Sequence, residues 1–283
     1  MLEPRIVDPL SLPLISISAE SAQWLVDSKA VAPAAGGLFY DLKPGKAAPK
    51  TPTELQKLGL VAPTTATANI ERTHAPYADA LAVLGAPGRR VNLSWREVDT
   101  GGEMPFFLKG RFAASGFVTK GERHLSPAFS TQVLSSTLVR KITGPDTWEA
   151  ALVPKAFALL GKLFVRDRKV TSRTEAELKA ELNDADASFA ALVSAKVMIR
   201  DAARYTPAPD YARALELTWS GHHLVIQTEP FDESGVKESF AFVGPPGERV
   251  WAYDQDVNGV EVSIFRSLDP AAAAELTATV LGS

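Results

Sequence analysis

The chain has 283 residues, and its 30 Lys and Arg against 33 Asp and Glu leave a formal net charge of −3. It has no cysteine, which excludes disulfides, thiolate-bound metals and a thiol nucleophile. The balanced charge argues against broad electrostatic binding of nucleic acid. No run of about 18 apolar residues occurs, so we expect no transmembrane helix. The first residues lack the positive charge and unbroken apolar run of a signal peptide, which predicts a cytoplasmic protein.

The first half predicts helices that lead into strands. Ser18 is a typical N-cap for a helix to Ser28, a Pro- and Gly-rich loop follows over 32–53, and Gly59 ends a second short helix. Strict alternation of apolar and polar residues over 91–95 indicates a half-buried strand. The remaining expected elements are a helix over 74–84, strands from Phe106 and over 112–119, and a helix from Ser126 to about Lys141.

The second half predicts a mostly helical stretch and then strands. We expect helices from a cap at Asp146 or Thr147 to about Phe164, over 174–182 and over 187–204. Strands are expected at 214–219, 223–228 and 238–243. The Asn258-Gly259 pair predicts a tight hairpin between strands 250–257 and 260–265. Asp269-Pro270 opens a last helix to about Leu281.

Two Trp-bearing segments suggest an internal repeat. Val91–Trp95 and Leu215–Trp219 both read apolar, polar, Leu, hydroxyl, Trp, and a Pro-started helix follows in each half. Chance is the alternative, because such patterns are common. The repeat predicts an α+β fold: one domain over 1–283, with a central, mostly antiparallel sheet, pseudo-two-fold halves (about 1–145 and 146–283) and helical bundles.

Motifs for chemistry are nearly absent. The sequence has no phosphate-binding loop, dinucleotide fingerprint, nucleophile elbow or zinc-protease motif. Asp254-Gln-Asp-Val-Asn-Gly259 imitates the start of a calcium loop, but Phe265 stands where the bidentate Glu belongs, so a hairpin is the better interpretation. His222-His223 is interpreted as a turn pair. We therefore expect no catalytic residue, no metal and no cofactor; an enzyme with a dispersed site around Asp254, Asp256 and His223 is the competing hypothesis.

The sequence allows two interpretations of a basic run. Lys162, Arg166, Arg168, Lys169 and Arg173 could bind an acidic partner, or form a solvated boundary, which their alternation with an acid and the lack of interleaved aromatic residues favour.

One loop predicts a protein-binding site. Met104, Phe106 and Phe107, flanked by Glu103 and Lys109, follow a Gly-Gly turn. Adjacent residues of a strand face opposite sides, so an exposed cluster that binds a partner and a buried central strand are equally compatible with the pattern.

The order of these segments resembles the EspG-like chaperones of type VII (ESX) secretion. The carriers are Ser18–Leu25, Glu54–Val61, Tyr77–Leu93, and the closing region from Gly247 through Asn258-Gly259 to the Ala-rich last helix. The resemblance implies a pseudo-two-fold fold with two helical bundles and no catalytic residues. It also implies binding of helical PE–PPE dimers before export, with roughly Glu97–Gly110 contributing.

The function expected from the sequence is thus a non-enzymatic, cytoplasmic chaperone for helical secretion substrates. It would bind protein, and neither nucleic acid nor membrane, as a monomer or homodimer. The alternative is a structural or assembly protein of a phage or injection-type particle.

Overall fold

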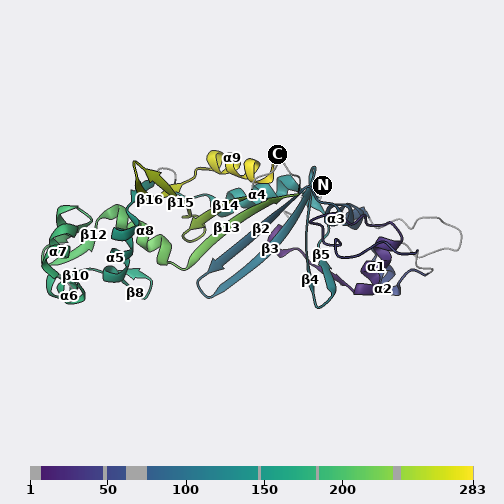
Figure 1. The fold of residues 1–283 in the computed structure, drawn as a ribbon, viewed down its shortest axis with the longest axis horizontal. Helices are drawn as coiled ribbons and strands as arrows, with labels where there is room; N and C mark the ends of the chain where they lie inside the picture. The colour runs from purple at the N-terminus through teal and green to yellow at the C-terminus, as the bar shows by residue number, and fades with distance from the viewer. Residues whose placement is uncertain are drawn as a thin grey trace, which may run out of the picture.

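The computed structural model describes residues 8–46, 50–61, 75–145, 148–182, 185–231 and 237–282. Its central feature is a wide antiparallel sheet with the strand order β1-β5-β4-β3-β2-β13-β14-β15-β16-β7, to which the short β6 adds at β4 (Figure 1). Within the described residues, no helix is long and apolar enough to cross a membrane.

Strands from the first half form one side of the sheet. They are β1 (Ile15–Ile17), β2 (Arg89–Glu97), β3 (Thr100–Lys109), β4 (Phe112–Thr119), β5 (Glu122–Leu125) and β6 (Phe129–Ser130). β2 to β5 follow one another through two-residue turns, and the last of them pairs with the earlier β1.

Strands from the second half form the other side. They are β7 (Glu149–Leu152), β13 (His222–Pro230), β14 (Glu238–Val243), β15 (Val250–Val257) and β16 (Val260–Ser267). β13 to β16 again follow one another, and the last pairs with the earlier β7. Read outward from the centre, the strand order of one half therefore repeats in the other. The halves meet where β2 pairs with β13, from His222 opposite Glu97 to Pro230 opposite Arg89.

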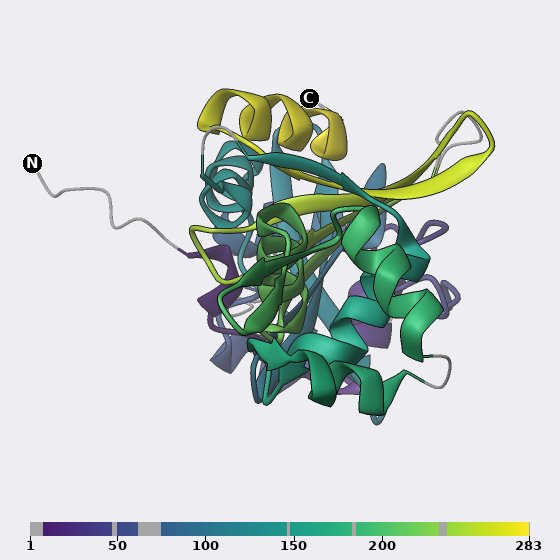
Figure 2. The same ribbon diagram turned by 90° about the vertical axis from the view of Figure 1, so that its left-hand side faces the viewer.

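Two helices cover the middle of one sheet face. α4 (Thr131–Ile142) and α9 (Pro270–Leu281) lie side by side there (Figures 1 and 2). Asp269 caps α9 by accepting a hydrogen bond from the Ala272 amide at 2.7 Å, as its Asp-Pro start predicts. The helices bury Leu138 and Val280 against Leu93 and Leu224 of the two central strands.

On the opposite face, the helices of the described residues lie towards its two ends. At one end lie α1 (Ala19–Asp27), α2 (Thr53–Lys57) and α3 (Ala75–Gly85), whose apolar side chains enclose Phe107 and Leu125; the 3-10 helix η1 (Pro9–Ser11) precedes them in the chain. Ser18 caps α1, and Gly59, with φ +68°, follows α2. The predicted loop over 32–53 contributes Phe39 to this core.

The other end carries α5 (Pro154–Phe164), α6 (Glu175–Glu181), α7 (Ala185–Ser194) and α8 (Pro209–Trp219). Small strands join them, namely β8 (Val165–Arg166), β9 (Lys169–Val170), β10 (Arg173–Thr174), β11 (Met198–Asp201) and β12 (Arg204–Pro207). These elements have their own apolar core around Leu160, Phe164, Leu178 and Leu215, at the left of Figure 1.

The structure corrects the predicted strand at 214–219. Leu215–Trp219 belongs to α8, and β13 pairs with β2 and β14 instead. Pro209 begins the helix in its first turn, and three alternating residues are too few to distinguish a strand from a helix. The repeat as inferred from the two Trp segments is therefore wrong, because Val91–Trp95 is a strand and Leu215–Trp219 is a helix.

Several helix boundaries also differ from prediction. The helix expected from Ser126 starts at Thr131, where Ser130 is the cap. Residues 149–152 are a strand, and the helix there starts at Pro154; the expected caps Asp146 and Thr147 lie outside the described residues. The helix over 187–204 ends at Ser194, and the β11–β12 hairpin follows. The Asn258-Gly259 hairpin is confirmed residue for residue at its turn.

β3 carries the two phenylalanines in question, and both are buried. Phe106 packs in the core under α4 and α9, edge-to-face with Phe129, whereas Phe107 packs in the core formed by α1 to α3. Of the two alternatives left open by the sequence, the buried central strand is the one that holds for the two phenylalanines, because helices cover both faces of β3 at this point.

Phe106→Ala should lower the free energy of unfolding by about 3–5 kcal/mol, since it empties a fully buried site. Phe117→Ala, on a ring of β4 that is 39% exposed, should cost less than about 1 kcal/mol. Urea unfolding of both variants checks this; equal costs would contradict the assignment of Phe106 to the core.

Candidate protein-binding surface

The other predicted site residues do not form a single cluster. Glu103 is exposed and Met104 is partly buried near the free end of β3. Lys109 is exposed at the opposite end, where its Nζ donates to the Ala82 carbonyl at 3.4 Å. Glu103 and Lys109 are six positions apart along the strand, or about 20 Å. One compact contact cannot use both ends of β3, and its free end carries Glu103 and Met104.

The β2–β3 hairpin projects beyond its neighbour. β3 pairs with β4 only over Phe106–Lys109, and at Pro105 the two hairpins diverge (Figure 1). Pro105 has no N–H to continue that ladder, and its carbonyl accepts from the Ser115 hydroxyl at 2.8 Å instead. β2 keeps its partner β13 up to Glu97. Near its tip, β13 is therefore the strand that pairs with this hairpin.

Val98 forms the tip in an unfavourable conformation. Its φ is +52°, a region in which β-branched residues are rare, yet it occupies a two-residue turn that favours Gly, Asn or Asp. Its side chain is 37% exposed. Neither backbone preference nor burial explains a valine here, which is the situation found where function imposes the residue.

Trp219 lies close by on a different element. It is the last residue of α8, is 48% exposed, and rests over Gly161 of α5. Gly221, just beyond it, has φ +81° and accepts from the Val98 amide at 3.2 Å. A Cβ on Gly221 would lie 3.4 Å from the Val98 Cα and 3.3 Å from Nη1 of Arg168. Glycine thus allows three turns to meet, which brings Val98 and Arg168 to Gly221, two residues after Trp219.

We call Val98, Trp219 and Arg168, with Gly221, the tip surface. The sequence prediction included Val98 within the expected binding region Glu97–Gly110, but it missed Trp219, which was assigned to a strand. The available signal was Trp219-Ser-Gly221, a large aromatic residue followed at once by a turn.

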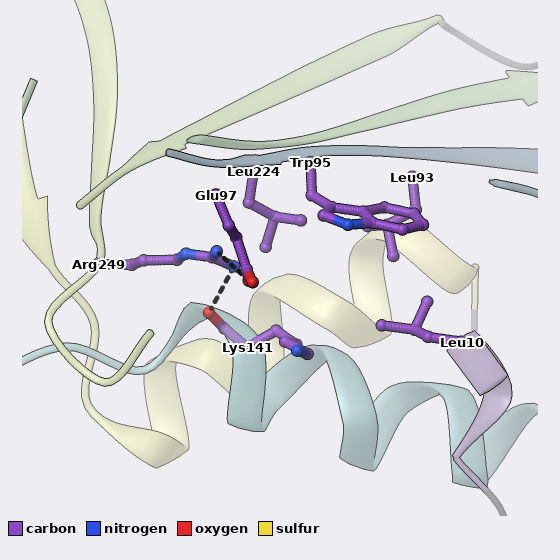
Figure 3. A pocket seen from close by; sticks show the side chains of 7 residues that line it. All are labelled: Leu10, Leu93, Trp95, Glu97, Lys141, Leu224 and Arg249. Carbon is purple, nitrogen blue, oxygen red and sulfur yellow. Dashed lines mark hydrogen bonds and ion pairs between the residues drawn. The ribbon is translucent and has the colours of Figure 1, made fainter. Parts of the chain in front are cut away.

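A buried arginine holds the hairpin next to its tip (Figure 3). Arg249 is 1% exposed; its Nε donates to the Gly244 carbonyl at 3.2 Å and its Nη1 to the Lys141 carbonyl at 3.3 Å. Its Nη2 lies 3.6 Å from Oε1 of Glu97, the last residue of β2. Burial lowers the pKa of Arg249, and Glu97 opposes that shift. Trp95 and Leu224 line the same small pocket. The arginine therefore ties the hairpin to α4.

The charge near the tip comes from arginines rather than from histidine. His223 lies opposite Arg96 in the β2–β13 ladder. Burial lowers the pKa of His223, and the nearby charges of Arg96, His222 and Arg249 lower it further. Its ring is accordingly neutral near pH 7, and Arg96, exposed on β2, provides the positive charge.

The carboxylates of the enzyme hypothesis have local partners. Asp254 accepts from the Ser263 hydroxyl and Asp256 from the Gly259 amide, both at 2.8 Å. They lie on the part of the β15–β16 hairpin that projects past β14, whose last pair is Ala241 with Ala252 (Figure 2). His223 instead lies opposite Val243, in the ladder. Phe265, at the failed calcium position, is buried. Among the described residues, no three His, Asp or Glu gather in a way that could hold a metal.

No protein-family model matches the chain, and neither does any curated protein sequence. Among solved structures, the model is similar to the Mycobacterium tuberculosis type VII secretion system chaperone EspG5, determined in complex with a PE25–PPE41 dimer. The identity is 11%, the TM-score is 0.47, and the match covers 95% of this chain and 96% of that chain.

Val98→Asn should raise the free energy of unfolding by about 1 kcal/mol, because Asn tolerates a positive φ that strains Val. The reciprocal change, Asn258→Val in the β15–β16 turn (φ +56°), should lower it by a similar amount. Urea unfolding measures both. A Val98→Asn variant less stable than wild type would show that the Val98 side chain serves the fold.

Proposed function

We propose that this chain is a non-enzymatic chaperone that binds helical, PE–PPE-like secretion substrates in the cytoplasm before type VII export. The observation that carries the proposal is the tip surface, where Val98 and Trp219 are both partly exposed beside turns that meet at Gly221. The resemblance of the sequence to EspG-like chaperones supplies the class of partner.

The composition of the tip surface suits protein recognition. Trp and Arg are the residues that most often dominate the binding energy of protein interfaces. Trp219 stands at the end of a helix and over a glycine, so little side-chain freedom remains to be lost when a partner binds. A partner helix or helix pair can cover side chains that are exposed on neighbouring turns, whereas a small molecule is usually enclosed by its pocket.

We further propose that residues 1–145 and 146–283 are pseudo-two-fold halves of one domain, with the axis between β2 and β13. The repeated strand order supports this, as do the matched positions of α4 and α9. Residues 165–207 add β8 to β12, α6 and α7 to the second half only. The tip surface uses a turn of that addition, at Arg168, so we expect one such surface and one partner per chain.

Glu103 and Met104, on the same projecting hairpin, are proposed to widen the contact. The partner would then touch β3 beyond the point where it leaves β4.

Trp219→Ala should raise the Kd for a cognate PE–PPE-like pair by at least about 30-fold, since it removes an interface anchor. Phe117→Ala is the matched control, because Phe117 is also a partly exposed aromatic but lies on the separate β4–β5 hairpin. The measurement is calorimetric titration with purified PE–PPE-like pairs encoded by the same genome.

Two results would contradict the proposal. One is that no such pair binds the wild-type chain. The other is that both variants bind as tightly as wild type while circular dichroism shows that they are folded.

A further inference from the structure

The structure separates the basic run into paired and unpaired residues. Arg166 and Arg173 both contact Oε1 of Glu181, at 2.6 and 2.8 Å, so they stabilise the fold of the second-half bundle. Lys162, Arg168 and Lys169 are exposed and have no ion pair within the part of the chain that the structure describes. The sequence favoured one solvated boundary for all five residues. The structure instead shows two residues in ion pairs and three exposed residues without one among the described residues.

The three unpaired residues lie on elements next to Trp219. Lys162 follows Gly161, the residue beneath the indole, along α5. Arg168 sits at the β8–β9 turn with its Nη1 against Gly221. Lys169 opens β9, which packs beside α8.

Arg96 adds a fourth cation from the other side. It is exposed on β2, two residues before Val98, and it too has no ion pair among the described residues. Three exposed carboxylates share the area, Asp99 and Asp167 on the turns and Glu103 on β3. Glu97 is turned to Arg249. Four cations against three carboxylates leave the rim of the tip surface net positive, although the whole chain is negative.

We infer that the docking surface of the partner is an apolar side chain or ridge encircled by carboxylates. This rests on the proposed function and names the chemistry of its partner. The apolar part meets Val98 and Trp219, and the carboxylates meet Lys162, Arg168, Lys169 and Arg96. Charge complementarity carries the inference, because unpaired cations next to an exposed tryptophan match that arrangement and oppose a basic partner.

The charged rim should change the association rate constant more than the equilibrium affinity. Exposed ion pairs contribute little to a finished contact, whereas a charged rim accelerates encounter and depends on salt. Screening shortens the reach of these charges from about 30 Å at 0.01 M salt to about 3 Å at 1 M.

Arg168→Glu combined with Lys169→Glu tests the inference. Stopped-flow association of the purified PE–PPE-like pair should be roughly tenfold slower than with wild type at about 0.05 M salt. The difference should nearly disappear at about 1 M salt. Lys120→Glu is the matched control, since Lys120 is an exposed turn cation with positive φ on the β4–β5 hairpin, and it should leave the rate unchanged.

The outcomes separate this inference from the proposed function. If Trp219→Ala abolishes binding while the double Glu variant associates at the wild-type rate in low salt, the acidic rim is wrong and the function stands. If the double variant associates faster, the partner is basic there and the inference is overturned. If the pair does not bind the wild-type chain at all, the proposed function falls and the inference falls with it.

Discussion

The pairing of β2 with β13 is the constraint on which the rest of the structure depends. It joins the two halves into one sheet, and its register sets what faces each side. With Leu93 opposite Ile226 and Trp95 opposite Leu224, the apolar residues point to α4 and α9. A slip by one residue would turn this apolar row to the uncovered face. The hydrophobic effect therefore fixes the register, and the register fixes the end of the ladder.

The end of that ladder creates the tip surface. Because Glu97 lies opposite His222, the turn after β2 must lie beside the turn before β13, which places Val98 against Gly221. Arg249 holds Glu97 from inside the molecule. Trp219 is the last residue of α8, just before the turn into β13, and its side chain is partly exposed there. The positive φ of Val98 and Gly221 and the exposure of Trp219 all occur where the β2–β13 ladder ends.

The sequence predicted the parts that local physics determines. The Asn258-Gly259 turn, the alternating strand at β2 and the caps at Ser18 and Asp269 depend on residues close together in the chain, and the structure confirms them. Leu215–Trp219 was predicted wrongly because its period is ambiguous and the packing of α8 on α5 decides it. The burial of Phe106 and Phe107 depended on helices remote in sequence. The meeting of the turns at residues 98, 168 and 221 could not be predicted, because they come together only in the folded chain.

Site-specific photo-cross-linking tests the central claim most directly. A photoreactive phenylalanine analogue would replace Trp219 in one variant and Val257 in another, because Val257 is also partly exposed but lies on the remote β15–β16 hairpin. With a bound PE–PPE-like pair, the account predicts a cross-link from position 219 to a helical segment of the partner and none from position 257. A cross-link from 257 alone would place the partner elsewhere and contradict the account.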